Sequence, residues 1–247
     1  MNIEVKITKT VEWIRKQGDM AGVKGMLVGV SGGIDSAVVA HLIKLAYPEN
    51  SIGVILPINS NENQLKDAEE LIKTCGITRL CVDLTETRDA LLGKTKEAMG
   101  DLFDEDFHRI SDANMRARLR MTALYTIANN LNYMVVGTDN AAEIFTGYFT
   151  KYGDGGVDIM PLANLLKSEV YEWAKFLKVP GSIINKTPSA DLWEGQTDEE
   201  ELGTTYGHID NYLKGESIPE NDLKIILNLN KKSEHKRHVP TRPPVFD

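Results

Sequence analysis

The sequence has 247 residues, 42% hydrophobic and 26% charged, which is enough for one large domain with a buried core. Its formal net charge of -8 argues against nonspecific binding to nucleic acid, because that binding requires a clustered surplus of Lys and Arg. The N-terminal segment is charged throughout and no apolar run approaches the roughly 20 residues that span a bilayer, so we expect a cytoplasmic protein with no membrane partner.

Short apolar runs alternate with helix-like segments along the chain. The expected helices cover residues 4–17, 34–46, 63–75, 85–99, 111–130 and 167–177. The expected strands cover residues 25–30, 52–57, 79–84, 133–137 and 159–162. This alternation predicts an α/β fold, in which a doubly wound, parallel, five-stranded sheet is flanked by helices. With no internal repeat or shift in composition, we expect one domain over residues 1–247.

Two segments lack regular apolar spacing. Residues 185–203 are polar and acidic, which predicts a long mobile loop with a helix starting near Asp198. Loops of this length are often functional, so this one is our candidate lid. Residues 233–247 are basic and then proline-rich, which is typical of an extended tail on a surface.

The hexapeptide SGGIDS at 31–36 lies between a predicted strand and a predicted helix. Exposed N–H groups and the helix dipole favour a bound anion there. The two glycines let the backbone approach phosphate, Ser31 and Ser36 add hydroxyl groups, and Asp35 is placed to hold a divalent cation. The segment matches neither GxxxxGK[ST] nor GxGxxG, and for SGG alone an ordinary turn is an equal alternative.

The hexapeptide resembles the SGGxDS motif of the ATP pyrophosphatases, which cleave ATP between the α and β phosphates. That family includes NAD synthetase, the ATPase domain of GMP synthetase, and several tRNA-modifying enzymes, and its fold is adenine nucleotide alpha hydrolase-like. The resemblance implies adenylation of a carbonyl or carboxylate oxygen. It does not select the substrate.

A second polar cluster, GTDNAAE at 137–143, follows the fourth predicted strand. The carboxyl ends of parallel strands line one crevice, so this cluster should face the phosphate loop. Glu143 can then join Asp35 on Mg²⁺, since this cation takes one or two carboxylates together with phosphate oxygens.

Five segments together resemble the successive motifs of ammonia-dependent NAD synthetases: GTDNAAE, GYFTKYGDGGVD, PLANLLKSEVYEWAK, KTPSADLW and EHKRHVP. The resemblance covers most of residues 113–240. It implies a ligase that adenylates deamido-NAD with ATP and amidates it with ammonia, giving NAD, AMP and pyrophosphate in the final step of NAD biosynthesis. It also implies a homodimer.

The resemblance assigns roles residue by residue. The implied ATP contacts are Gly29, Val30, Ser31, Gly32, Gly33, Ile34, Asp35, Ser36, Thr138, Lys167 and Ser189. The implied deamido-NAD contacts are Arg118, Lys151, Asp158, His235 and Lys236, with Arg116 and Arg120 as alternatives to Arg118. Mg²⁺ is assigned to Asp35 and Glu143, and the catalytic residues are Asp154, Lys167 and Ser31, with Asp154 receiving ammonium.

Other readings of the sequence remain open. One is another SGGxDS enzyme, of the GMP synthetase or tRNA-modifying type, although the acidic charge disfavours a tRNA substrate. Another is a non-catalytic adenine-nucleotide sensor. We expect free ammonia as the nitrogen donor, because a glutamine-hydrolysing domain of typical size does not fit beside the ligase, although a separate glutaminase could feed it.

Overall fold

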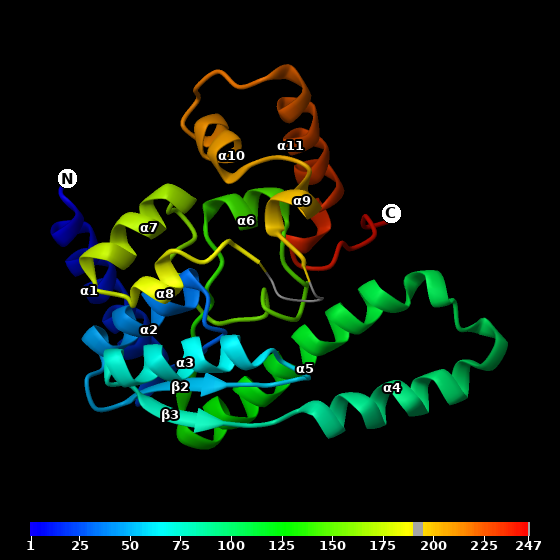
Figure 1. The fold of residues 1–247 in the computed structure, drawn as a ribbon, viewed down its shortest axis with the longest axis horizontal. Helices are drawn as coiled ribbons and strands as arrows, with labels where there is room; N and C mark the ends of the chain where they lie inside the picture. Colours follow the sequence, from blue (N-terminus) through cyan, green and yellow to red (C-terminus); the bar gives the residue numbers. More distant parts are fainter. Residues whose placement is uncertain (190–194, 247) are drawn as a thin grey trace.

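A parallel sheet of four strands forms the centre of the computed structural model, which describes residues 1–189 and 195–246 (Figure 1). The strands are β1 Gly25–Gly29, β2 Ser51–Ile55, β3 Thr78–Cys81 and β4 Tyr133–Val135, in the order β3-β2-β1-β4. Leu27 in the central strand is paired with Ile52 on one side and Val135 on the other. The chain winds outward from β1 and then returns to its other side, so the crevice between β1 and β4 is where α/β sheets bind ligands.

Helices cover both faces of the sheet because apolar side chains of β1 point alternately to each. Met26 and Val28 pack on one face, and Leu27 packs on the other. The first face is covered by α1 Ile3–Ala21, α2 Ile34–Ala46, α3 Glu62–Cys75 and α7 Lys167–Phe176. The second face is covered by α5 His108–Leu131. The doubly wound α/β prediction is therefore confirmed.

The predicted fifth strand at 159–162 is absent from the described residues, so the expected strand number was wrong. Val136 and Ile159 form only an isolated parallel bridge. Pro161 has no N–H group, so the ladder cannot continue past it. Asp158 replaces the missing strand beside β4: its N–H donates to the Val135 carbonyl at 2.9 Å, and its Oδ2 accepts the Val135 N–H at 2.7 Å.

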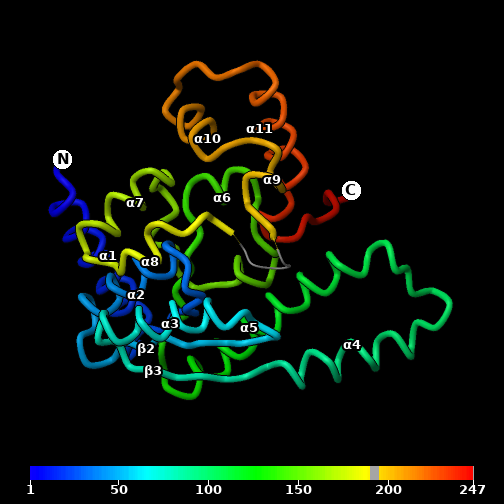
Figure 2. Tube along the Cα trace, viewed as in Figure 1, coloured from blue at the N-terminus to red at the C-terminus, as the bar shows by residue number. Residues whose placement is uncertain are grey.

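Four helices form a cap with its own buried apolar cluster. They are α6 Ala141–Thr146, α9 Asp198–Leu202, α10 Tyr206–Leu213 and α11 Glu220–Lys232. Because α6 begins just beyond the carboxyl end of β4, the cap lies beside the ligand-binding edge of the sheet, as the Cα trace in Figure 2 also shows. The sequence predicted the start of α9 at Asp198 but none of the other three helices.

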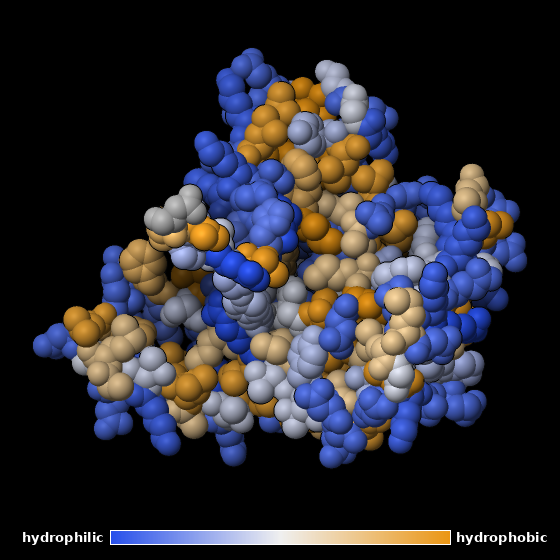
Figure 3. Space-filling model, turned by 180° about the vertical axis from the view of Figure 1, so that it is seen from behind, coloured by the Kyte–Doolittle hydropathy of each residue, from blue (hydrophilic) through white to orange (hydrophobic). Residues whose placement is uncertain are grey.

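A long helical arm projects from the body of the molecule (Figure 1). It consists of α4 Thr85–Met99, the 3₁₀ turns η1 Gly100–Leu102 and η2 Glu105–Phe107, and the first half of α5. Three of its apolar side chains are largely exposed: Leu102 (81%), Phe107 (66%) and Ile110 (59%). Seen from behind, the tip of the arm carries a group of apolar side chains (Figure 3). Exposed apolar groups of this kind mark interaction surfaces.

The two segments expected to be irregular contain some regular structure. After α8 Gly181–Ile184 the chain runs to α9, and the Asp198 N–H donates to the Pro188 carbonyl at 3.1 Å. Residues 190–194, in the middle of the expected mobile loop, lie outside the described part. The C-terminal tail starts with the 3₁₀ turn η3 Glu234–Lys236, and residues 238–246 have no regular structure. Among the helices of the described ranges, none is long and apolar enough to cross a membrane.

Candidate active site

The phosphate loop joins β1 to α2 as the sequence predicted. The Ser36 hydroxyl donates to the Gly33 carbonyl at 2.9 Å, and the Gly33 N–H donates to Ser31 Oγ at 3.2 Å. Gly33 is the N-cap of α2 but has no side chain to cap it, so no side chain satisfies the first N–H groups of the helix. The first residues of α2 line the pocket, and the N-terminus of a helix favours an anion.

Gly32 has the backbone conformation that the loop requires. Its φ is +81°, a left-handed value that side chains rarely adopt. A Cβ at this position would also lie 2.9 Å from the Gln64 carbonyl oxygen and 3.0 Å from Asp67 Cβ. The loop is therefore held tightly against α3, and only glycine fits at this turn.

Lys167 lies between the two carboxylates that the sequence assigned to a metal. Its Nζ is 2.6 Å from Asp35 Oδ2 and 3.4 Å from Glu143 Oε1. Burial opposes the charge of Lys167, but Asp35 and Glu143 outweigh it and raise the pKa of the ammonium group. The first residue of α7 is thereby joined to the first turns of α2 and α6.

Glu143 is fixed by the cap of its own short helix. Asn140 accepts from the N–H groups of Ala142 and Glu143, and its own N–H donates to Glu143 Oε2 at 3.0 Å, which completes a capping box. The Asn140 side chain also donates to Asp35 Oδ1 at 3.0 Å. Burial, and then the charge of Asp35, raise the pKa of Glu143 to about 7.

The segment 147–157 forms the opposite wall of the pocket. Asp154 Oδ1 accepts the Thr150 N–H at 2.8 Å, and the Thr150 hydroxyl donates to Asn114 on α5 at 2.7 Å. Burial raises the pKa of Asp154, against hydrogen bonds from the backbone that lower it. A Cβ at Gly155 would lie 2.5 Å from the Phe149 ring, so this wall is tightly packed.

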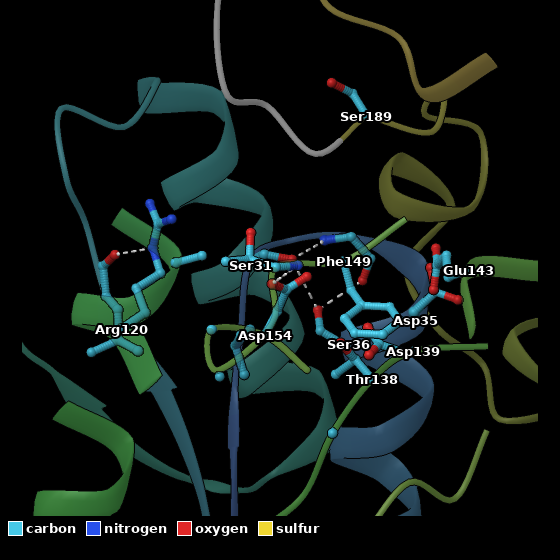
Figure 4. Close-up of a pocket in the computed structure, with 18 of the residues that line it drawn as sticks. Ser31, Asp35, Ser36, Arg120, Thr138, Asp139, Glu143, Phe149, Asp154 and Ser189 are labelled. Carbon is cyan, nitrogen blue, oxygen red and sulfur yellow. Dashed lines mark hydrogen bonds between the residues drawn. The ribbon is translucent and has the colours of Figure 1, made fainter. Parts of the chain in front are cut away.

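One cavity of about 470 Å³ connects these parts, and most residues of the phosphate loop line it together with Asp154 and Lys167 (Figure 4). Its described lining holds six acidic side chains, Asp35, Asp139, Glu143, Asp154, Asp198 and Glu201. It holds four basic ones, Arg120, Lys167, Lys186 and Lys236. A cradle for anions inside an acidic pocket implies that cations enter with the ligand.

The comparisons with known proteins agree with this geometry. The model of the NAD synthase family matches residues 6–240. The chain belongs to the NAD synthase family. It is 55% identical to the NH(3)-dependent NAD(+) synthetase of Alkaliphilus oremlandii, over 99% of this chain and 98% of that one, and 53% identical to the enzyme of the same name from Alkaliphilus metalliredigens, over 99% and 100%. The predicted membership of the NAD synthetase family and the predicted ligase activity are confirmed.

Solved structures of NAD synthase relatives have the same fold. The NMN synthetase from Francisella tularensis superposes with a TM-score of 0.93 at 38% identity, covering 99% of this chain and all of that one. The NH3-dependent NAD synthetase from Campylobacter jejuni superposes with a TM-score of 0.80 at 28% identity, over the same shares. The match over full lengths confirms the predicted fold class.

In this member of the NAD synthase family, only Lys236 among the residues predicted for deamido-NAD lines the main cavity. Lys236 lines the cavity, and its Nζ donates to the carbonyls of Gly147 and Phe149 at 2.8 and 2.6 Å. Lys151 Nζ donates to the His235 carbonyl, and the Arg118 Nε donates to the Lys151 carbonyl at 3.3 Å. Lys236 therefore lies at the cavity, and the other three form a connected row outside its lining.

Asp158 is placed apart from the main cavity. Its two carboxylate oxygens accept from the Val135 N–H and from the Tyr125 hydroxyl, at 2.7 and 3.0 Å. It lines a second, smaller cavity of about 290 Å³ beside α5 and β4. Both oxygens of the carboxylate are therefore used in hydrogen bonds at the edge of the sheet and on α5, and the sequence motif alone did not reveal this.

Some residues in or beside the pocket had no definite role from the sequence. Arg120, one of the three candidate arginines, is the one that lines the cavity; its Nε donates to the Leu56 carbonyl at 3.0 Å, and burial lowers its pKa to about 10. Tyr206 donates to Glu143 Oε1 at 3.2 Å. Asp139 lies within the quoted GTDNAAE motif, which is the one signal that could have identified it.

The remaining predicted ATP contacts also lie at the cavity. Thr138 lines it three residues beyond the end of β4, and Ser189, the last residue described before 190, lines it as well (Figure 4). Of the predicted ATP residues, only Gly32 is absent from the lining, because it faces α3. The structure therefore brings all but one of the residues predicted to contact ATP together around one cavity, with Glu143 and Asp154.

Proposed function

We propose that this chain adenylates the nicotinate carboxylate of deamido-NAD with ATP and then amidates it with ammonia, releasing NAD, AMP and pyrophosphate. The observation that carries the proposal is the single cavity in which the 31–36 loop faces Asp154 and Lys167. The name shared by relatives of up to 55% identity supports the same substrates. We expect the enzyme to act in the cytoplasm.

ATP is the activator because a carboxylate resists attack by ammonia. Conversion to an acyl adenylate supplies a better leaving group, and the first product released is pyrophosphate. The N–H groups at the start of α2, with the hydroxyls of Ser31 and Ser36, bind the phosphates in this proposal. Lys167 stabilises the negative charge that develops during transfer, together with Thr138 and Ser189 as further ATP contacts.

Asp35 and Glu143 would hold Mg²⁺. Both carboxylates are largely buried at the cavity and both already face the Lys167 ammonium. Two carboxylates suit an ion that takes its other ligands from phosphate oxygens and water. When bound, Mg²⁺ neutralises phosphate charge during cleavage of ATP.

Ammonia enters at Asp154 in this proposal. The carboxylate lines the wall opposite the phosphate loop and is fixed by the Thr150 N–H, so it can receive ammonium and take a proton from it. The attacking nitrogen then forms the C–N bond while the bond to AMP breaks. Exclusion of water protects the adenylate from hydrolysis.

The dinucleotide would extend from the cavity along the row of Arg118, Lys151, His235 and Lys236, where basic side chains can meet its pyrophosphate. For Asp158 we propose an indirect role, through the edge of the sheet, because its carboxylate is committed there. We further propose a homodimer that buries the exposed apolar side chains of the arm.

The test is incubation with Mg-ATP, deamido-NAD and ammonium, with NAD, AMP and pyrophosphate measured together. Equal amounts of NAD and AMP are expected. AMP without NAD would require another acceptor, and no turnover would favour the nucleotide sensor. Glutamine as the sole nitrogen source should give far less NAD, and equal activity with glutamine would contradict the ammonia assignment.

We also consider nicotinate mononucleotide as a second candidate acceptor, on the basis of one comparison and one feature of the pocket. The solved structure with a TM-score of 0.93 is called an NMN synthetase, whereas the NAD synthetase from Campylobacter jejuni reaches 0.80. Of the residues assigned to deamido-NAD, only Lys236 lines the cavity, and a mononucleotide requires less of the rim. Comparison of kcat/KM for the two acceptors decides; we expect the dinucleotide to be preferred, and a higher value for the mononucleotide would reverse the assignment.

A further inference from the structure

Asp139 is a buried carboxylate that no step of the proposed reaction uses. It follows Thr138 at the carboxyl end of β4, is 4% exposed, and lines the main cavity. Within the part of the chain that the structure describes, its Oδ2 is buried and has no hydrogen-bond partner. Its neighbour Asn140 is fully engaged by Asp35, Ala142 and Glu143, so Asp139 differs sharply from the residue beside it.

The charges that act on Asp139 are all negative. Asp154 has the largest effect, followed by Glu143 and Asp35. In the view of Figure 4, Asp139 lies between Asp154 on one side and Asp35 and Glu143 on the other. Burial, and then these carboxylates, raise the pKa of Asp139 well above its ordinary value. A buried carboxylate in this setting is costly unless a cation accompanies it.

Three basic side chains of the pocket have partners other than Asp139, which are acids for Lys167 and backbone carbonyls for Arg120 and Lys236. Lys167 is bound to Asp35 and Glu143. Arg120 donates to the Leu56 carbonyl and Lys236 donates to two carbonyls, while the charges of both side chains act to lower the pKa of Asp154. A bound water molecule could donate a hydrogen bond to Asp139, but it would leave the charge uncompensated. The missing partner of Asp139 is therefore a small cation that enters the cavity.

We infer that Asp139 is the second carboxylate of the ammonium site, so that Asp139 and Asp154 bind the substrate cation from two sides. This inference rests on the proposed function and names a further residue that contacts its nitrogen substrate. Ammonium offers four N–H donors and one positive charge, which suits two carboxylates better than it suits a single one. The Mg²⁺ pair, Asp35 and Glu143, is already distinct because Lys167 joins it.

The chemistry balances with ammonium as the bound species. One proton passes from ammonium to Asp154, and the freed nitrogen lone pair forms the C–N bond to the acyl carbon. The electrons of the C–O bond leave with AMP, and the second proton is lost from nitrogen to solvent. Asp139 holds the cation beside the acyl carbon before the first of these steps.

The test is Asp139→Asn, which preserves size and removes the charge. The KM for ammonium should rise roughly tenfold to hundredfold, as expected for loss of a hydrogen bond to a charged group, with the KM values for ATP and deamido-NAD unchanged. Hydroxylamine, largely uncharged at the assay pH, should still yield the hydroxamate at the wild-type rate. Asp19→Asn, an exposed acid on α1, is the matched control and should change nothing.

Two outcomes overturn the inference: an unchanged KM for ammonium, or a change in the Mg²⁺ requirement instead. If Asp139→Asn does not fold, the KM for ammonium is measured in Asp139→Ser instead, and thermal unfolding of the wild-type protein provides a second test of the ammonium site. Ammonium chloride well above its KM should raise the unfolding temperature of wild type more than sodium chloride does, and equal temperatures would contradict the site. Exchange of pyrophosphate into ATP, dependent on deamido-NAD, needs no ammonium. Its absence in wild type would refute the proposed function separately.

Discussion

The Lys167 ammonium is 2.6 Å from the Asp35 carboxylate and 3.4 Å from the Glu143 carboxylate, so one buried cation ties three helices to the nucleotide pocket. Lys167→Met should lower the rate of ATP–pyrophosphate exchange about a hundredfold or more, because a positioned charge is lost from the transition state. It should also destabilise the fold by roughly 3–5 kcal/mol, since two buried carboxylates lose their partner. Lys175→Met, an exposed change on the same helix, is the control. An unchanged exchange rate would contradict the role of Lys167.

Gly32→Ala should weaken ATP binding and stability together. The change combines a left-handed φ of +81° with a Cβ only 2.9 Å from the Gln64 carbonyl oxygen. Gly22→Ala is a matched control, because its φ is +66° and nothing lies within 4 Å of the added Cβ. We expect about 1 kcal/mol of destabilisation for the control and about 1–3 kcal/mol more for Gly32→Ala, measured by urea unfolding. Equal losses would show that packing against α3 is unimportant.

The stability of the metal-free protein should fall as the pH rises from about 4.5 to about 7. Burial and then Asp35 raise the pKa of Glu143 from 4.5 to about 7, with Lys167 opposing and Asp198 adding to the shift. The folded state therefore binds more protons than the unfolded state in this window, and that advantage disappears as Glu143 ionises. Glu143→Gln should remove a pH-dependent contribution of at most on the order of 3 kcal/mol. Urea unfolding at both ends of the window measures it, with Glu12→Gln on the exposed face of α1 as the control. Identical slopes in Glu143→Gln and wild type would contradict the assignment.

Leu102→Glu should convert the proposed dimer to a monomer. The side chain is 81% exposed on the arm that also exposes Phe107 and Ile110. A charge there would oppose burial of the arm in an interface. Met20→Glu, at a position 73% exposed on α1, should leave the dimer intact. Sedimentation velocity distinguishes the two variants, and a monomeric wild type would refute the dimer itself.

Asp158→Ala should lower stability while leaving the KM for deamido-NAD close to that of wild type. The carboxylate accepts from the Val135 N–H and the Tyr125 hydroxyl, and removing it leaves a backbone donor without a partner. The expected loss is roughly 1–3 kcal/mol in thermal or urea unfolding. A large increase in KM with unchanged stability would instead support direct contact with the dinucleotide.

Much of the fold was predictable because the sheet and its helices alternate in the sequence. The bounds of α2 and α4 match the predicted segments, since each is an uninterrupted run between a strand and a turn. The cap was largely missed because α6 and α9 are too short to display a helical period, and α10 and α11 bury few apolar side chains. The prediction of a fifth strand was wrong because Pro161 has no N–H group to continue the ladder, and because Asp158 occupies the free N–H and carbonyl groups of Val135.

The candidate site was predictable where a motif fixes local geometry. The 31–36 loop needs only its own strand and helix, so its shape follows from its sequence. The choice between Arg118 and Arg120 does not, because residues two apart on a helix point in nearly opposite directions and only the packing of α5 decides which one meets the cavity. The lack of a partner for Asp139 depends on three other segments, and no local pattern contains that information.

The two hydrogen bonds between Asp158 and Val135 also protect the edge of the sheet. An edge strand normally presents unpaired N–H and C=O groups that can template pairing with a foreign chain. At β4 both groups of Val135 are taken, one by the Asp158 carboxylate and one by the Asp158 N–H. A single acidic residue thus provides steric and electrostatic resistance to intermolecular strand addition, so its loss would promote self-association of partly unfolded molecules as well as lower stability.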